Sequence, residues 1–257
     1  MKQQLYMIPV MDALRAKDEC PFCLIEKELE EHSLDFVLGS QSSYMESDVR
    51  EQTDETGFCR EHFKMMFQYG NHLGSSMILE THLKKLSAEL KNEMEHDSGA
   101  VKKGLFSHFH KDASVQEEGS RVGRWIRKKE KTCYICDHIK SNYKLYVSTF
   151  FELCRRAEPE FTELLKTGKG FCIHHFADVM DGAEKYLKED EQKALKEIII
   201  PQMNENLNRV IGDLEWFQVK YDYRFRDADW KDSKDAVQRG MQKIAGGYPA
   251  KPPYQQK

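Results

Sequence analysis

Residues 19–23 read ECPFC and residues 57–63 read GFCREHF, and both patterns return as TCYIC at 132–136 and GFCIHHF at 170–176. Each of the four cysteine and histidine positions recurs 113 residues later. The second and third cysteines of each copy are 36 positions apart. Such a constant register is hard to obtain by chance. We therefore interpret the chain as a tandem duplication whose retained part is a Cys-Cys-Cys-His frame.

Each copy of this frame has the composition of a metal site. Structural zinc takes four thiolate or imidazole ligands in a tetrahedron, and a Cys-x-x-His pair on a helix places both side chains on one face. We expect each repeat to hold its own ion, with Gly57 and Gly170 making the sharp turns before the Cys-x-x-His helices. The predicted ligands are Cys20, Cys23, Cys59 and His62 in the first repeat, and Cys133, Cys136, Cys172 and His175 in the second.

The predicted cofactor is zinc, with two ions per chain, and an iron–sulfur cluster is the alternative. Clusters are usually held by four cysteines, so three cysteines and one histidine favour zinc. A disulfide framework is disfavoured because each set would leave one thiol over. Four closed ligands also leave no open position for water or substrate, which favours a structural role over a catalytic one.

The rest of the sequence predicts an all-α fold of two pseudo-repeats, each organised around one Cys3His metal site. Apolar residues recur at helical spacing from 73 to 95 and in a long final segment, where Pro201 predicts a break or kink. The polar stretch 40–57 is expected to be mainly a loop. The predicted domains are a first repeat at 1–96, a charged linker at 97–131, a second repeat at 132–245 and a disordered Gly/Pro tail at 246–257.

Composition and charge exclude several classes of protein. The chain is 40% hydrophobic and 32% charged, which is typical of a globular protein rather than a disordered one. Its net charge of -4 gives no global electrostatic case for nucleic acid, and no stretch approaches the roughly 18 apolar residues of a membrane helix. Because the N-terminus also lacks a secretory signal, we expect a cytoplasmic protein with reduced cysteines.

The motifs favour a non-enzymatic function. No phosphate-binding Gly-rich loop, nucleophile elbow or His-Glu-x-x-His pattern is present in the sequence. The leading hypothesis is a helical scaffold that is stabilised by bound metal ions and binds an unknown protein or small-molecule partner. The alternatives are an iron–sulfur or other redox protein, and a zinc-dependent nucleic-acid-binding protein that would use the basic cluster around Trp125.

Several stretches together resemble a bacterial family catalogued as domain of unknown function 6062, found mostly in anaerobic Gram-positive species. The resemblance spans nearly the whole chain and implies no established activity or catalytic residues, although anaerobic hosts strengthen the iron–sulfur alternative. The stretches that carry it are YMIPVMDAL at 6–14, ECPFCLIEKELEE at 19–31, YMESDVRE at 44–51, GFCREHF at 57–63, LGSSMILETHL at 73–83, YDYRF at 221–225 and KDAVQRGMQKIAGG at 234–247.

Overall fold

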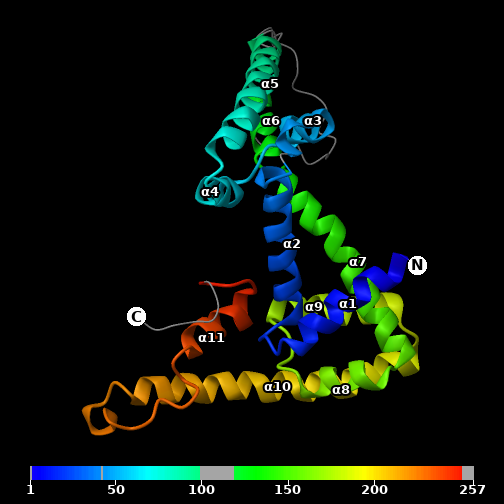
Figure 1. The fold of residues 1–257 in the computed structure, drawn as a ribbon, viewed down its shortest axis with the longest axis vertical. Helices are drawn as coiled ribbons and strands as arrows, with labels where there is room; N and C mark the ends of the chain where they lie inside the picture. The colour runs from blue at the N-terminus through cyan, green and yellow to red at the C-terminus, as the bar shows by residue number, and fades with distance from the viewer. Residues whose placement is uncertain (1, 42, 99–118, 251–257) are drawn as a thin grey trace, which may run out of the picture. The chain divides into compact units, whose positions relative to one another are not determined.

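The computed structural model describes residues 2–41, 43–98 and 119–250, and every regular element within these ranges is a helix (Figure 1). The all-α prediction is therefore confirmed. None of the described helices is both long and apolar enough to cross a membrane. In chain order the elements are α1 (Lys2–Arg15), α2 (Pro21–Leu38), η1 (Ser43–Met45), α3 (Ser47–Thr56), α4 (Arg60–Tyr69), α5 (His72–Ser98), α6 (Arg121–Lys129), α7 (Tyr134–Arg156), α8 (Pro159–Thr167), α9 (Ile173–Tyr186), α10 (Glu189–Val219), η3 (Tyr223–Phe225) and α11 (Ala236–Ala245).

The cysteine motifs lie at helix starts, as their sequences predict. The Cys-x-x-Cys pairs lead into α2 and α7. The cysteine of each Cys-x-x-His pair is the N-cap of α4 or α9. Gly57 and Gly170 precede these caps with φ of 59° and 75°, a backbone region that favours glycine. The repeated frame is therefore a set of four helix beginnings.

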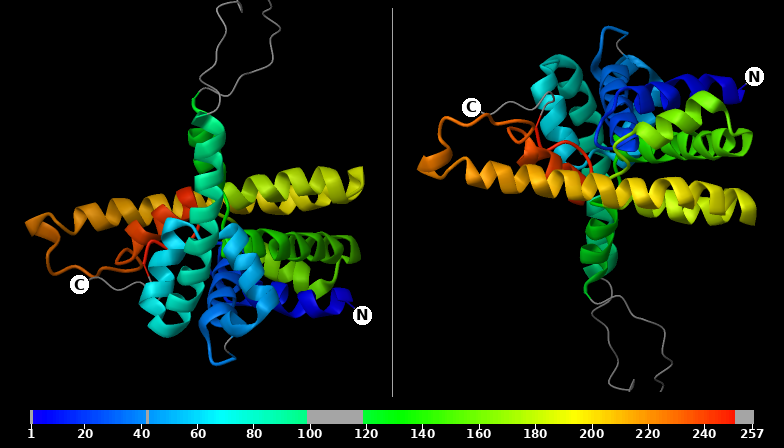
Figure 2. Two further views of the ribbon diagram at one scale, coloured as in Figure 1. Left: turned by 90° about the horizontal axis from the view of Figure 1, so that it is seen from above. Right: turned by 90° about the horizontal axis from the view of Figure 1, so that it is seen from below.

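Three details of the predicted secondary structure are wrong. The expected loop at 40–57 contains α3, whose ten residues form a regular helix. The long helix α10 continues through Pro201 without a break (Figure 2). In the predicted tail, residues 246–250 belong to the described structure and contact a cysteine motif, while the remaining residues of the tail lie outside the described ranges.

The chain forms two compact units that do not follow the order of the repeats. Unit 1 contains Met1–Leu29 and Ser141–Lys257, and unit 2 contains Glu30–Lys140. Each unit therefore combines the Cys-x-x-Cys motif of one repeat with the Cys-x-x-His motif of the other. Within the predicted linker at 97–131, α6 packs on α5 in unit 2, and residues 99–118 lie outside the described structure.

Unit 1 is built around aromatic side chains. Phe22 of α2 lies edge-on to Phe150 of α7 and stacks with Phe171, which directly precedes a predicted ligand. Phe150 also contacts Phe161 of α8. The helices α8, α9 and α11 all pack against α10 (Figure 1). The core of unit 1 therefore adjoins the loop that delivers Cys172.

Unit 2 has a more aliphatic core, around which α5 packs on α3, α4 and α6. Phe58 is the counterpart of Phe171 and is likewise buried beside a predicted ligand. Cys133 itself belongs to the core cluster, so the predicted ligands of unit 2 also adjoin its hydrophobic centre. The buried residues of this cluster are Leu34, Val37, Leu38, Tyr44, Phe58, Met66, Ile78, Cys133 and Ile135.

Candidate metal centres

The eight predicted ligands come together in two groups of four, but not in the predicted combinations. The structure joins Cys20 and Cys23 to Cys172 and His175, a group we call site A, in unit 1. It joins Cys133 and Cys136 to Cys59 and His62, which we call site B, in unit 2. The expectation that each repeat closes its own site is therefore wrong.

The length of the helices explains this exchange of ligands. The 18 residues of α2 carry the chain about 27 Å along the helix axis, and the 23 residues of α7 carry it about 35 Å. Each Cys-x-x-Cys motif stands at the start of one of these helices, and the Cys-x-x-His motif of the same repeat follows only after its end. The chain that follows each helix does not return to the start of that helix, and each Cys-x-x-Cys motif instead meets the Cys-x-x-His motif of the other repeat.

In site A three cysteine sulfurs surround one histidine nitrogen. The Nδ1 atom of His175 lies 3.3 Å from Sγ of Cys20, 3.4 Å from Sγ of Cys23 and 3.3 Å from Sγ of Cys172. The sulfurs of Cys23 and Cys172 are 3.7 Å apart. All four residues are buried, so site A is closed to solvent.

Site B has the same arrangement. The Nδ1 atom of His62 lies 3.1 Å from Sγ of Cys59, 3.2 Å from Sγ of Cys133 and 3.4 Å from Sγ of Cys136. The sulfurs of Cys59 and Cys136 are 3.9 Å apart. Cys136 is exposed and Cys59 is half-buried, so site B is open on the side of these two thiols.

Each histidine is held by a glutamate on the face away from the sulfurs. The Nε2 atom of His175 lies 3.2 Å from Oε2 of Glu26, and the Nε2 atom of His62 lies 3.1 Å from Oε1 of Glu30. A carboxylate accepts hydrogen bonds, so it favours a proton on Nε2, and an ion among the sulfurs would then meet the lone pair of Nδ1. Histidine ligands of metals commonly have such a partner.

The electrostatics of the clusters favour one thiolate in each. Burial raises the pKa of the Cys133 thiol, but its hydrogen bond with His62 and those with the backbone of Cys136 and Cys59 together outweigh burial and lower this pKa to about 6. Contacts with Cys20 and Cys23 lower the pKa of Cys172, and the contact with Cys172 raises the pKa of Cys23. Because neighbouring thiolates repel each other, ionising all three sulfurs of a cluster requires a cation among them.

Site A is closed by the C-terminal segment. Lys243 of α11 is buried, and its Nζ donates hydrogen bonds to the carbonyl oxygens of Glu19 at 2.6 Å and Lys169 at 2.5 Å. Lys243 thereby ties the loop before Cys20 to the loop before Cys172. Two residues after α11, the N–H of Gly247 donates a hydrogen bond of 3.2 Å to Sγ of Cys23.

In site B two hydrogen bonds to backbone carbonyls join the two loops that carry the ligands. The N–H of Tyr134 donates to the carbonyl oxygen of Gly57 at 2.9 Å. The hydroxyl of Thr132 donates to the carbonyl oxygen of Thr56 at 2.7 Å. These bonds fix the two loops that carry the ligands but leave the outer thiols uncovered.

Sequence reasoning missed the residues that surround the ligands. Glu26 and Glu30 lie four positions apart on α2, a spacing that places them on one helix face. Charged residues at that spacing are normally part of a solvated surface, so the pattern carries no metal signal. Lys243 is more than 60 residues from every ligand in the sequence, and no local pattern connects it to a cysteine.

The histidines next to the ligands have other roles. His174 is exposed, and with His175 and Asp178 it forms a third group of metal-ligand type in the described structure. The Nδ1 atom of His175 already faces the sulfurs of site A, however, so this group shares its central residue. His138 lies 2.8 Å from the hydroxyl of Ser33 through its Nδ1 atom and belongs to neither cluster.

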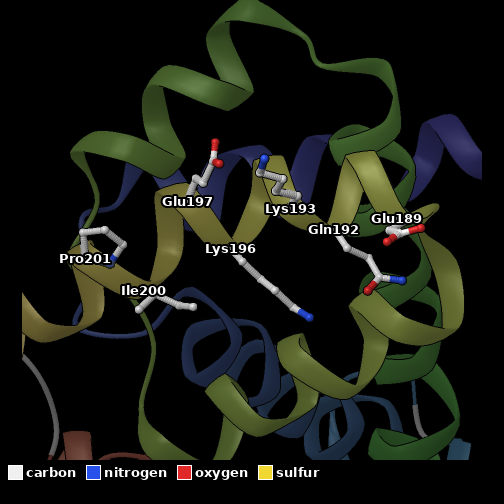
Figure 3. Close-up of a pocket in the computed structure, with 7 residues that line it drawn as sticks. All are labelled: Glu189, Gln192, Lys193, Lys196, Glu197, Ile200 and Pro201. Atoms are coloured by element: carbon white, nitrogen blue, oxygen red, sulfur yellow. The ribbon is translucent and has the colours of Figure 1, made fainter.

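A surface pocket on unit 1 does not resemble a binding site. All the residues that line it come from α10, between Glu189 and Pro201. Lys193 and Glu197 point to one side of the helix, while Lys196 points to the other (Figure 3). The pocket is the open face of a single helix, and its charged groups do not point toward a common ligand.

Comparison with known proteins identifies the family but no relative of known activity. No curated protein and no solved structure matches the chain. A family model matches residues 1–251, which is nearly the whole sequence and includes all eight clustered residues. The chain thus belongs to the family described as "Family of unknown function (DUF6062)".

Proposed function

We propose that this protein is a zinc-binding helical scaffold, with one structural ion in site A and one in site B. The observation that carries the proposal is the convergence of three sulfurs and one imidazole nitrogen twice in one chain, with all ligand atoms of each group within 4.8 Å of one another. Each group is a complete set of four ligands, which is the composition of structural zinc sites.

The spacing of the ligand atoms supports a single ion in each site. Zinc–sulfur bonds of about 2.3 Å at tetrahedral angles place two sulfurs about 3.8 Å apart, and the two sites have 3.7 Å and 3.9 Å. In an iron–sulfur cluster the four ligands are divided among two or four irons, so some of the ligand atoms stand further apart than the 4.8 Å within which each group lies here. The spacing therefore disfavours a cluster, whereas a single thiolate-bound iron would fit it as zinc does.

The helices explain why ions would matter to this fold. Each ion would join two helix beginnings that come from different repeats, and so from distant parts of the sequence. Structural zinc contributes roughly 10–16 kcal/mol of apparent binding energy in small zinc domains. An ion in each unit would therefore contribute strongly to the order of that unit.

The scaffold part of the proposal rests on the closed ligand sets. A metal with four protein ligands has no position for a substrate, so activity would have to come from a partner or ligand held elsewhere on the helices. A nucleic-acid partner is disfavoured because basic residues of α6 face acidic ones. Arg121 pairs with Glu93, and Lys129 pairs with Glu89 at 2.7 Å.

Elemental analysis tests the proposal directly. The full chain would be purified without oxygen and without a metal-affinity tag, and its metal content and visible absorption would be measured. We expect two zinc ions per chain and no colour. Iron with inorganic sulfide and a broad visible absorption band would overturn the proposal in favour of an iron–sulfur protein, and a metal-free folded chain would overturn it altogether.

A further inference from the structure

We propose that unit 2 contains a binding cavity for a small planar aromatic ligand that carries an N–H donor, built on the loops of site B. The cavity lies between α5, α6 and the two loops that lead to Cys59 and Cys133, and its volume is about 250 Å³. Ligand pockets in proteins commonly measure about 300–1,000 Å³, so this cavity suits a ligand of one or two fused rings.

The walls of the cavity are mainly apolar and partly aromatic. Leu86 and Leu90 of α5 form one side, Trp125 and Ile126 of α6 form another, and Phe58 adjoins the Cys59 loop. Flat aromatic ligands gain both burial and ring contacts in such surroundings. The walls therefore favour an aromatic ring over an extended aliphatic chain.

The polar groups of the cavity favour a hydrogen-bond donor on the ligand. The Nδ1 atom of His82 lies 2.9 Å from the carbonyl oxygen of Asp54. A carbonyl oxygen can only accept, so Nδ1 carries the proton in the neutral ring, and Nε2 is left as an acceptor. This Nε2 lies 2.7 Å from the place where a Cβ of residue 57 would stand, and both His82 and Gly57 line the cavity.

The charged groups at the cavity point to the same ligand chemistry. The ammonium of Lys129 pairs with Glu89 at 2.7 Å and with Glu55 at 3.5 Å, so it is already neutralised and does not favour an anion. Glu130, an exposed residue, also lines the cavity, and a carboxylate is an acceptor when ionised. An imidazole acceptor and a carboxylate together suit a ligand with an N–H group.

The cavity and site B are formed in part by the same two backbone loops. The hydrogen bonds from Tyr134 to Gly57 and from Thr132 to Thr56 join the loops that hold the ligands of site B, and Thr56, Gly57 and Thr132 also line the cavity. An ion in site B would hold this lining in place. This coupling rests on the proposed function, whereas the cavity itself does not.

Indole is the probe we would use first, measured by calorimetry on the full, metal-loaded chain. We expect saturable one-to-one binding with a Kd below about 1 mM. Benzofuran has nearly the same shape but lacks the N–H group, and we expect it to bind roughly five- to tenfold more weakly. Equal binding of both probes would overturn the donor requirement, and no saturable binding of indole would overturn the cavity proposal.

Matched tryptophan variants locate the binding. Ile126→Trp fills the cavity and should abolish indole binding. Leu83→Trp adds the same ring to an exposed residue of α5 outside the cavity and should leave binding unchanged. Circular dichroism and metal content would verify that both variants fold. Indole binding that survives Ile126→Trp would contradict the assignment.

The coupling to site B has a separate test. With the ion of site B lost in Cys136→Ser, indole should bind more weakly, and indole should slow the release of that ion from the unmodified chain to a chelator, because coupling is reciprocal. Unchanged affinity and unchanged release would overturn the coupling. A chain purified without metal would refute the proposed function, while calorimetry with indole would still test the cavity.

Discussion

Sites A and B have the same ligands and nearly the same distances, yet they differ in how they meet solvent. All four residues of site A are buried, whereas site B has one exposed and one half-buried cysteine. In site A a buried lysine and a glycine N–H from the C-terminal segment cover the ligand loops. In site B two hydrogen bonds to backbone carbonyls join the loops, and the outer thiols stay open.

This difference shows which part of the repeated Cys3His cluster is the same in both copies and which part differs. Metal coordination requires particular atoms at particular distances, so the four ligands and the glycine turns are the same in both copies. The surroundings need only hold the ligand loops, and many kinds of contact can do so. Both histidines even take their carboxylate partners from the same helix, α2, rather than from equivalent helices.

The strongest test of the comparison removes one ligand from each site. We expect Cys172→Ser and Cys59→Ser each to lose one metal ion, because an incomplete set binds zinc far less tightly. Cys172→Ser should loosen unit 1 and Cys59→Ser unit 2, which hydrogen exchange followed by mass spectrometry can resolve. Loss of both ions from either single variant would refute two independent sites.

The charge network of site A gives the next largest effect. Glu19 is buried, with Arg209 at 2.6 Å and Lys243 at 3.4 Å from its carboxylate, so Glu19→Gln removes the charge that faces one half-buried and one buried cation. We expect unit 1 to lose about 3–5 kcal/mol of stability, measured by denaturant unfolding. Glu160→Gln breaks an exposed pair with Arg15 and should cost far less stability, because water screens the pair. Equal losses in the two variants would exclude a special role for Glu19.

Substituting the glutamates that face the histidines, Glu26 and Glu30, should have smaller effects than removing a ligand. Glu26→Gln should lower the metal affinity of site A, and Glu30→Gln that of site B, each by about 10- to 100-fold. Competition with a chelator of known affinity measures both. Glu28→Gln alters an exposed residue of the same helix and should change neither affinity. A drop in affinity at the other site would contradict the histidine–glutamate pairing described above.

The smallest expected effect needs no substitution and depends on the different solvent exposure of the cysteines in sites A and B. A thiol-alkylating reagent should modify Cys136 first and Cys59 next, and a chelator should remove the ion of site B before that of site A. The reason is access, since every sulfur of site A is buried. Peptide mass spectrometry at successive times gives the order of labelling. Simultaneous labelling of both sites would mean that site A opens as readily as site B.

Local sequence patterns were reliable wherever the deciding interactions are local. The helix starts at the cysteine motifs and the positive φ of Gly57 and Gly170 follow from capping and turn chemistry over a few residues. The eight clustered residues could also be named, because their spacing recurs. The expected loop at 40–57 failed, since its polar residues gave no strong apolar pattern although Val49 and Thr53 of α3 are buried.

By itself, then, the sequence determined an all-α chain, a duplicated Cys3His frame and the eight residues that compose it. Only the tertiary structure decided which Cys-x-x-Cys motif meets which Cys-x-x-His motif, because that depends on where α2 and α7 deliver the chain. A helix advances about 1.5 Å per residue, so each long helix carries a repeat away from its own first pair of ligands. The contacts of Glu26, Glu30 and Lys243 likewise arise only after distant segments pack together.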